Sequence, residues 1–188
     1  MSEQLDLPPS PMTVEEFCAW ADAAPRGRFE LAEGQPVAMA PERTAHVEAK
    51  APAWLALRNA IRSAGLDCCA YVDGLAVRVD ATTAYQPDAL VNGGEPPARD
   101  ALVAPNAVIV VEVTSPSTSR VDALDKFVAY LRVPSIHHHV KVDTVKRVVV
   151  HHQRVKPDVI SSSIFGSGAL TLDPPGITIE GEDLFPDN

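Results

Sequence analysis

The sequence predicts a mixed α/β fold in which a central β-sheet is flanked by helices. Residues 107–114 are almost all apolar and β-branched, which is typical of a strand buried on both faces. Apolar residues recur at helical spacing in three longer segments, and short segments with strand-like patterns lie between them. Strands, a helix and further strands in this order are typical of a mixed sheet covered by helices.

Length and composition indicate one globular domain. The chain has 188 residues, 46% of them hydrophobic, which is enough for one full-sized core. Residues 1–12 contain three prolines, so we expect a flexible lead-in there and a single domain over residues 13–188. No apolar run reaches the roughly 18 residues of a membrane span, and residues 1–9 lack the features of a signal peptide. We therefore expect a cytoplasmic protein.

The charge and the cysteines argue against two classes of protein. A formal net charge of −9 is evidence against a protein that holds DNA by charge alone. It is compatible with an enzyme that has a small basic surface, or an acidic site neutralised by a metal ion. Cys18, Cys68 and Cys69 are odd in number and lack metal-ligand spacing, so we expect reduced, small apolar residues rather than a disulfide framework.

The N-terminal part is predicted to form two helices separated by a β-hairpin. A capping box at residues 13–16 begins a helix that ends near residue 24. Residues 28–31 and 35–39 are expected to pair around a Glu-Gly turn. A longer helix is expected to end at Gly65, with Thr44 as its cap and an apolar stripe of Val47, Trp54, Leu57 and Ile61. Pro52 either kinks this helix or delays its start to about Ala51.

The middle of the chain is predicted to be rich in strands. Residues 68–72 and 75–80 are expected to form a hairpin closed by Asp73-Gly74, followed by a strand over 87–91. The loop over 92–106 is long, which favours a functional or mobile segment. After the strand over 107–114, residues 115–118 are expected to turn the chain into a helix from about residue 119 to residue 132.

The C-terminal part is predicted to be a hairpin followed by short strands. The hairpin joins residues 136–142 to 147–153, and the later elements are strands at 159–164, 169–172 and 177–180 with a turn at 182–185. The two hairpin arms carry His137, His138, His139, His151 and His152. Three imidazoles can bind zinc or nickel, so a metal-binding protein is one hypothesis, but no catalytic signature is present. We expect an exposed ribbon with adventitious metal affinity, or a weakly pH-sensitive surface.

Two acids stand out because each lies in a short apolar run. Asp88 and Glu112 would be costly to bury unless they are paired or hold a cation, and on neighbouring strands they would suit Mg²⁺. Thr114 points to the same side as Glu112, at the position where a lysine would orient a water. Lys126, which lies i+4 from Asp122 on the next helix, is able to reach the same place.

A purely structural interpretation of these residues remains open. Asp88 is able to cap a turn after Pro87, and Glu112 with Lys126 is able to form an internal ion pair that fixes the helix to the sheet. A buried ion pair of that kind is weak evidence for function.

Taken together, the motifs resemble a known family. They are Pro87-Asp88, the string Glu112-Val113-Thr114-Ser115-Pro116-Ser117-Thr118, Asp122 and Lys126, Tyr130, Val142-Asp143, Phe29-Glu30-Leu31 with Gly34, and His46. Over residues 12–186 the chain resembles the Uma-type restriction endonuclease family, a branch of the PD-(D/E)XK nuclease superfamily. The resemblance implies a restriction-endonuclease-like fold with a central mixed β-sheet and a homodimer.

The resemblance also implies roles for individual residues. Asp88 and Glu112 would hold Mg²⁺ or Mn²⁺, Lys126 would be a displaced catalytic lysine, and Glu30 would be a further catalytic acid. His46, Thr114 and Asp122 would have supporting roles. The implied activity is hydrolysis of phosphodiester bonds in DNA, and the alternative is a non-catalytic module that binds nucleic acid or a protein partner. Pro52 and the polar residues 137–141 depart from the family pattern.

Overall fold

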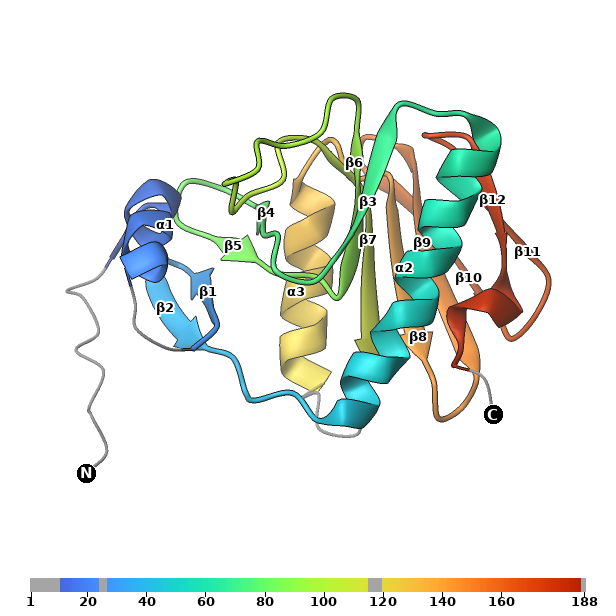
Figure 1. The fold of residues 1–188 in the computed structure, drawn as a ribbon, viewed down its shortest axis with the longest axis horizontal. Helices are drawn as coiled ribbons and strands as arrows, with labels where there is room; N and C mark the ends of the chain where they lie inside the picture. Colours follow the sequence, from blue (N-terminus) through green and yellow to red (C-terminus); the bar gives the residue numbers. More distant parts are fainter. Residues whose placement is uncertain (1–10, 24–26, 115–119, 187–188) are drawn as a thin grey trace.

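The computed structural model describes residues 11–23, 27–114 and 120–186 (Figure 1). The turn predicted at residues 115–118 and residues 1–10 of the expected lead-in lie outside these ranges. At the start of the described chain, the Met12 N–H donates to the Gly34 carbonyl oxygen at 2.9 Å, and the Met12 side chain is buried. Residues 11 and 12 are therefore already in contact with the fold.

A six-stranded mixed sheet forms the centre of the molecule, as predicted. Its strands, in spatial order, are β10 (Val159–Phe165), β9 (Val148–Lys156), β8 (His138–Asp143), β7 (Ala107–Thr114), β6 (Ala89–Gly93) and β3 (Cys68–Val72). β7 and β8 are parallel, and every other neighbouring pair is antiparallel. The apolar run of β7 is almost entirely buried and lies inside the sheet, which confirms the central strand.

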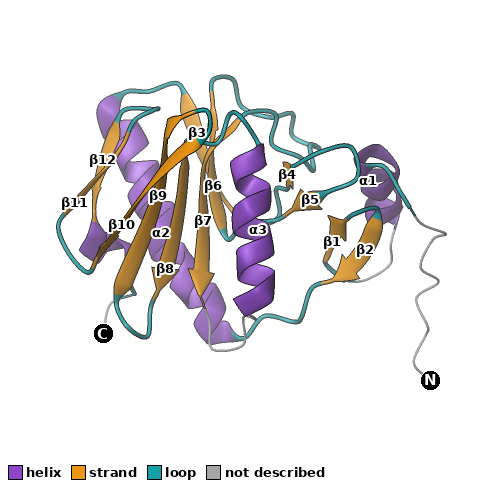
Figure 2. Cartoon of the chain, turned by 180° about the vertical axis from the view of Figure 1, so that it is seen from behind, coloured by secondary structure: helices purple, strands orange, loops and turns teal. Residues whose placement is uncertain are grey.

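Two helices cover opposite faces of this sheet, as the views in Figures 1 and 2 show. α3 (Arg120–Arg132) connects β7 to β8, and such a crossover is what a parallel pair requires. α2 (Thr44–Ala64) lies on the other face beside β11 (Ala169–Leu172), β12 (Ile177–Glu180) and the short helix η1 (Gly181–Leu184). None of the described helices is both long and apolar enough to cross a membrane.

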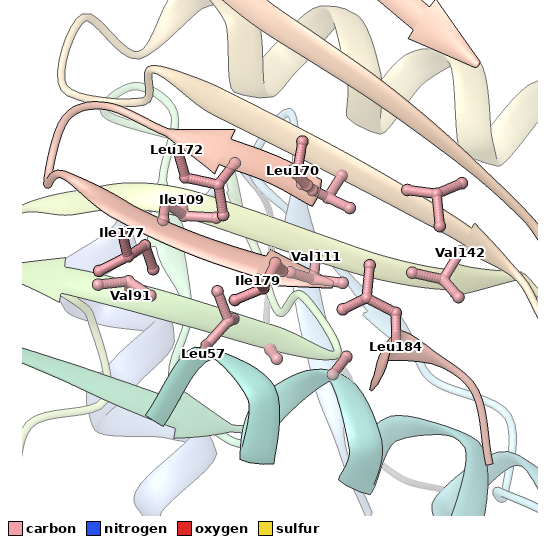
Figure 3. Packing of buried hydrophobic residues seen from close by; sticks show 14 of the residues in the cluster. Leu57, Val91, Ile109, Val111, Val142, Leu170, Leu172, Ile177, Ile179 and Leu184 are labelled. Atoms are coloured by element: carbon pink, nitrogen blue, oxygen red, sulfur yellow. The ribbon is translucent and has the colours of Figure 1, made fainter. Parts of the chain in front are cut away.

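The main core lies between α2, the β11–β12 hairpin and the sheet (Figure 3). Its α2 residues are Ala49, Ala53, Leu57 and Ile61, and Lys50 is buried on the same helix. The predicted stripe is therefore wrong at Val47, which is 51% exposed. Counting back from Leu57 by helical turns leads to Ala53 and Lys50, so Val47 falls on the outer side.

The predicted C-terminal signal of α2 is confirmed, and the predicted N-terminal cap is wrong. Gly65 has a φ of +64° and ends the helix as expected. Thr44 is not the cap, because Arg43 occupies that position and makes no side-chain capping bond. The helix runs through Pro52. Because proline has no N–H, the carbonyl of Glu48, four residues earlier, lacks its usual helical hydrogen bond. Glu48 is exposed, so water can donate to this carbonyl instead.

A smaller sheet and one helix stand beside the central sheet. The strands, in order, are β2 (Gln35–Ala38), β1 (Phe29–Ala32), β5 (Ala84–Tyr85) and β4 (Val77–Arg78), and α1 (Val14–Ala23) packs on them. The predicted hairpin is confirmed, with Glu33 and Gly34 at positive φ in its turn. The capping box is also confirmed, because Glu16 accepts the Thr13 N–H at 2.8 Å.

The hairpin predicted at Asp73-Gly74 is wrong. Both residues have positive φ, as a tight turn requires, but β3 pairs with β6 and β4 pairs with β5. The two residues instead carry the chain from the central sheet to the smaller one. An alternating strand pattern fits either sheet, and the choice of partner depends on residues far away in the sequence.

The histidine hairpin (β8 and β9) is present, but its predicted exposure is wrong. His138, His139 and His151 are all buried, since α3 and the β11–β12 hairpin cover the two faces of these strands. His138 Nδ1 lies 2.9 Å from His151 Nε2, and His139 stacks on His152 with ring centroids 5.6 Å apart. Burial lowers the pKa of His138 and His151 to about 4 and the pKa of His139 to about 3. These imidazoles are therefore neutral at pH 7.

Candidate functional site

The pairing of β6 with β7 brings the two acids predicted from the sequence together. Asp88 immediately precedes β6, and Ala89 is opposite Val111 of β7, so Asp88 lies beside the end of β7 that carries Glu112. The Val113 N–H donates to Asp88 Oδ2 at 2.6 Å. The antiparallel pairing of β6 with β7 thus brings together two acids that are 24 positions apart in the sequence.

Glu112 lies on the central strand, and its side chain is half-buried. The Tyr130 hydroxyl donates to Glu112 Oε1 at 2.9 Å. Burial raises the pKa of Glu112 to about 8, and the charge of Asp88 adds to this effect, while Lys126 opposes it. The Thr114 hydroxyl, two residues further along β7, is buried without a hydrogen-bond partner in the described part of the chain.

Lys126 and Glu30 form an ion pair next to Glu112. Lys126 on α3 donates from Nζ to Glu30 Oε1 at 2.7 Å, and the same oxygen accepts the Gln86 N–H at 2.8 Å. Glu30 is only 8% exposed, so it does not face solvent as an ordinary strand residue would. Because Lys126 lowers the pKa of Glu112, the ammonium is close enough to act on that acid. Asp88, Glu112, Lys126 and Glu30 are together called the acid site.

His46 joins the acid site from the first turn of α2. Its Nε2 atom lies 3.3 Å from Asp88 Oδ1, and this hydrogen bond raises the pKa of His46 above its ordinary value. Burial raises the pKa of Asp88, but the contacts with His46 and the Val113 N–H outweigh burial and leave that pKa below its ordinary value. Asp88 is therefore ionised at neutral pH, in contrast to Glu112.

A second group of charges, which was not predicted from the sequence, lies beside Asp88. Lys50 is 2% exposed, and its Nζ lies 3.2 Å from Asp88 Oδ1, 3.2 Å from Asp73 Oδ2, and in contact with Glu42. Arg28 pairs with Glu42 at 3.0 Å and with Asp73 at 2.9 Å. These five residues are called the lysine cluster.

A signal for the lysine cluster was present in the sequence. His46 and Lys50 lie one turn apart on the same helical face that continues with Ala53 and Leu57. A lysine on the apolar stripe of a helix needs acidic partners, because an unpaired buried ammonium is very costly. The partners themselves, Glu42 and Asp73, come from segments whose placement depends on the whole fold.

Asp88 and two neighbouring side chains are arranged as possible metal ligands. One atom each of Glu42, His46 and Asp88 lies within 4.8 Å of the others. Two carboxylates and an imidazole can bind a divalent ion such as Mn²⁺. Among the described residues this group includes Asp88 but not Glu112, whose Oε1 is bonded to Tyr130. Asp122 belongs to α3, and its side chain lies outside the described part of the structure.

Comparison with solved structures supports the fold. The chain is similar to a crystal structure from Anabaena variabilis ATCC 29413, described as "a putative nuclease belonging to DUF820", with a TM-score of 0.68 and 14% sequence identity. The similarity covers 93% of this chain and 97% of the other. At this level of identity the similarity shows a shared fold rather than an activity. Comparison with curated proteins gives no match.

Comparison with protein families identifies the chain's relatives. The family named Uma2, described as "Putative restriction endonuclease", matches residues 14–185. This range includes every element of the two larger sheets and all members of the acid site and the lysine cluster. The chain therefore belongs to the Uma2 family.

Proposed function

We propose that the chain is a metal-dependent DNA endonuclease in which Asp88 and Glu112 hold Mg²⁺ or Mn²⁺. The observation that carries this proposal is the state of Glu112. Its burial on the central strand raises its pKa to about 8, and it lies close enough to Asp88 for the charge of Asp88 to contribute. Burial and a neighbouring acid both disfavour the ionised form of a carboxyl group. A cation bound to both acids stabilises their ionised forms. Membership of the Uma2 family supports the same interpretation.

The chemistry of the donors fits such an ion. Asp88 and Glu112 offer hard oxygen ligands, which Mg²⁺ and Mn²⁺ prefer. The Thr114 hydroxyl, which has no hydrogen-bond partner among the described residues, supplies a further buried oxygen on the same side of β7 as Glu112. His46 and Glu42 also lie close to Asp88, but the Lys50 ammonium contacts the oxygens of Glu42 and Asp88.

The protein's own residues prepare the site for hydrolysis of a phosphodiester. The Tyr130 hydroxyl and the Val113 N–H fix the carboxylates of Glu112 and Asp88. Glu30 holds the Lys126 ammonium near Glu112, where its charge can orient an attacking water and offset negative charge on the phosphate. A divalent ion, when bound, supplies positive charge that lowers the pKa of a water and stabilises the phosphate.

DNA is the proposed substrate, and a homodimer is the proposed assembly. The DNA substrate rests on the description of the family as restriction endonucleases, and the homodimer rests on the resemblance of the sequence motifs. The net charge of −9 fits a protein whose contact with DNA depends on the bound cation and on local basic groups.

One observation favours a second function, a nuclease-fold module that binds nucleic acid or a protein without cutting. Asp88 is already bonded to His46, Lys50 and the Val113 N–H, so its charge is compensated within the protein. A carboxylate whose charge is compensated in this way can have a purely structural role.

Calorimetry and DNA cleavage on the same samples separate the two functions. We expect wild-type protein to bind Mn²⁺ and to cut plasmid DNA, and Glu112→Gln to lose both properties. Lys126→Met should retain the ion but cut about 100- to 1,000-fold more slowly, because it removes only a charge that acts on the reacting phosphate. Glu180→Gln, which changes an exposed strand acid on β12, is the matched control. Wild-type protein that neither binds the ion nor cuts DNA would support the non-catalytic module.

A further inference from the structure

A buried ammonium occupies the middle of the lysine cluster. Lys50 is 2% exposed, and its Nζ contacts three carboxylates, at 3.2 Å for Asp73 and Asp88 and at shorter range for Glu42. Lysine is almost never fully buried unless it is paired, and a single partner would ordinarily suffice. Three acidic partners around one ammonium resemble the surroundings of a metal ion more than those of a simple ion pair.

The same surroundings contain ligands that metals use. Glu42 and Asp88, which both contact Lys50, also form the group with His46 in which one atom of each residue lies within 4.8 Å of the others. Two independent observations thus coincide: a ligand set with metal-like spacing, and a fixed positive charge among its oxygens. The Lys50 ammonium contacts two of the three side chains in this group, Glu42 and Asp88.

The charge balance of the lysine cluster is nearly complete without a metal. Glu42, Asp73 and Asp88 contribute three negative charges, and Lys50 and Arg28 contribute two positive ones. These five residues therefore carry one net negative charge, and the His46 imidazole contacts Asp88 at the same oxygen as Lys50. A second divalent ion would add more positive charge than this cluster can balance while Lys50 stays in place.

Lys50 also determines which oxygen of Asp88 is available. Oδ1 contacts both Lys50 and His46, whereas Oδ2 accepts only the Val113 N–H among the described contacts. An ionised carboxylate has about four lone-pair sites, so the remaining capacity lies on Oδ2. This is the oxygen bonded to β7, the strand that carries Glu112.

We propose that Lys50 is a positioning residue that takes the place of a second divalent ion, so that the site binds one ion, at Asp88 and Glu112. This inference rests on the proposed function. A second ion would neutralise the carboxylates around it. Here Lys50 and Arg28 supply that positive charge from fixed side chains. Removing the ammonium should leave Glu42, Asp73, Asp88 and His46 as a vacant second cation site.

The test counts bound Mn²⁺ ions by calorimetry and by electron paramagnetic resonance, without substrate. Wild-type protein should bind one ion per chain and give the spectrum of isolated Mn²⁺. Lys50→Met keeps the apolar stem and removes the charge, so it should bind two ions and show a spectrum broadened by coupling between them. Lys156→Met, at an exposed position on β9, should bind one ion, as wild-type protein does.

A second variant keeps the test decisive if repulsion among the acids unfolds Lys50→Met. The double variant Lys50→Met/Asp73→Asn lowers this repulsion and keeps Glu42, His46 and Asp88, so it should still bind two ions. One ion in both variants, with one in wild-type protein, would overturn the role of Lys50 and leave the proposed function intact. Two ions in wild-type protein would also overturn it. No ion in wild-type protein would refute the proposed function itself.

Discussion

The acid site and the histidine hairpin lie next to each other, since Glu112 is on β7 and His138 and His139 are on the neighbouring strand β8. The two regions differ in what their ionisable side chains contact. At the acid site opposite charges are paired, as in the contact of Lys126 with Glu30 at 2.7 Å. In the histidine hairpin the side chains meet others of their own kind, and burial lowers the pKa of each of the three buried imidazoles. Paired charges stay available for chemistry, whereas imidazoles that are neutral contribute mainly packing.

The difference also predicts opposite responses to pH. Glu112 has a folded pKa raised to about 8, so the native state binds more protons than the unfolded state between pH 4.5 and 8. Its contribution to stability is complete below pH 4.5 and is lost as the pH rises through 8. The buried histidines have lowered folded pKa values, so their contribution is present above the ordinary value of 6.5 and is lost as the pH falls towards 4 and 3.

The largest effect is expected at Glu112. Without divalent ions, the contribution of this residue to the free energy of unfolding should fall by about 4 kcal/mol between pH 5 and pH 9, because the buried carboxyl ionises. Glu112→Gln keeps the neutral shape and should remove this decrease. Urea denaturation at a series of pH values measures the slope. Equal slopes in wild-type protein and Glu112→Gln would show that the acid is solvated rather than buried, and Glu180→Gln controls for the loss of one charge.

A somewhat smaller effect of opposite sign is expected at His139. Both of its ring nitrogens are buried without hydrogen-bond partners among the described residues, and it packs against Phe127 with ring centroids 5.4 Å apart. Because its folded pKa is about 3, its contribution to stability should fall by about 3 kcal/mol between pH 7 and pH 4. His139→Phe should remain folded at pH 7 and lose this part of the acid sensitivity. An unchanged acid transition in His139→Phe would contradict the assignment.

Local signals in the sequence were sufficient for much of the fold. The capping box at Thr13, the end of α2 at Gly65 and the apolar run of β7 each depend on neighbouring residues, and each is confirmed. The partner of β3 and the exposure of the histidine hairpin depend on which elements pack from far along the chain. The alternation of apolar and polar residues in a strand does not show which distant elements pair with it or cover it. The predictions of an Asp73-Gly74 hairpin and of an exposed histidine ribbon were therefore wrong.

The same distinction applies to the site. An acid in a short apolar run is conspicuous, and the pairing of β6 with β7 does place Asp88 beside Glu112. Lys50 was missed because the apolar stripe of α2 was placed through Val47, although Lys50 lies one turn before Ala53 and Leu57 on the buried side. Arg28, Glu42 and Asp73 carried no local signal, since each lies near the end of an element and is defined as a partner only by the folded structure.

The most direct test of the central claim is the number of protons released when Mn²⁺ binds. If Glu112 has a pKa of about 8 and becomes a ligand, binding at pH 7 must release about one proton from it. Calorimetric titrations in two buffers with different ionisation enthalpies give this number directly. We predict about one proton at pH 7 and almost none above pH 9.5. Binding that releases no proton at pH 7 would contradict the claim that Glu112 is a metal ligand held in a buried, neutral state.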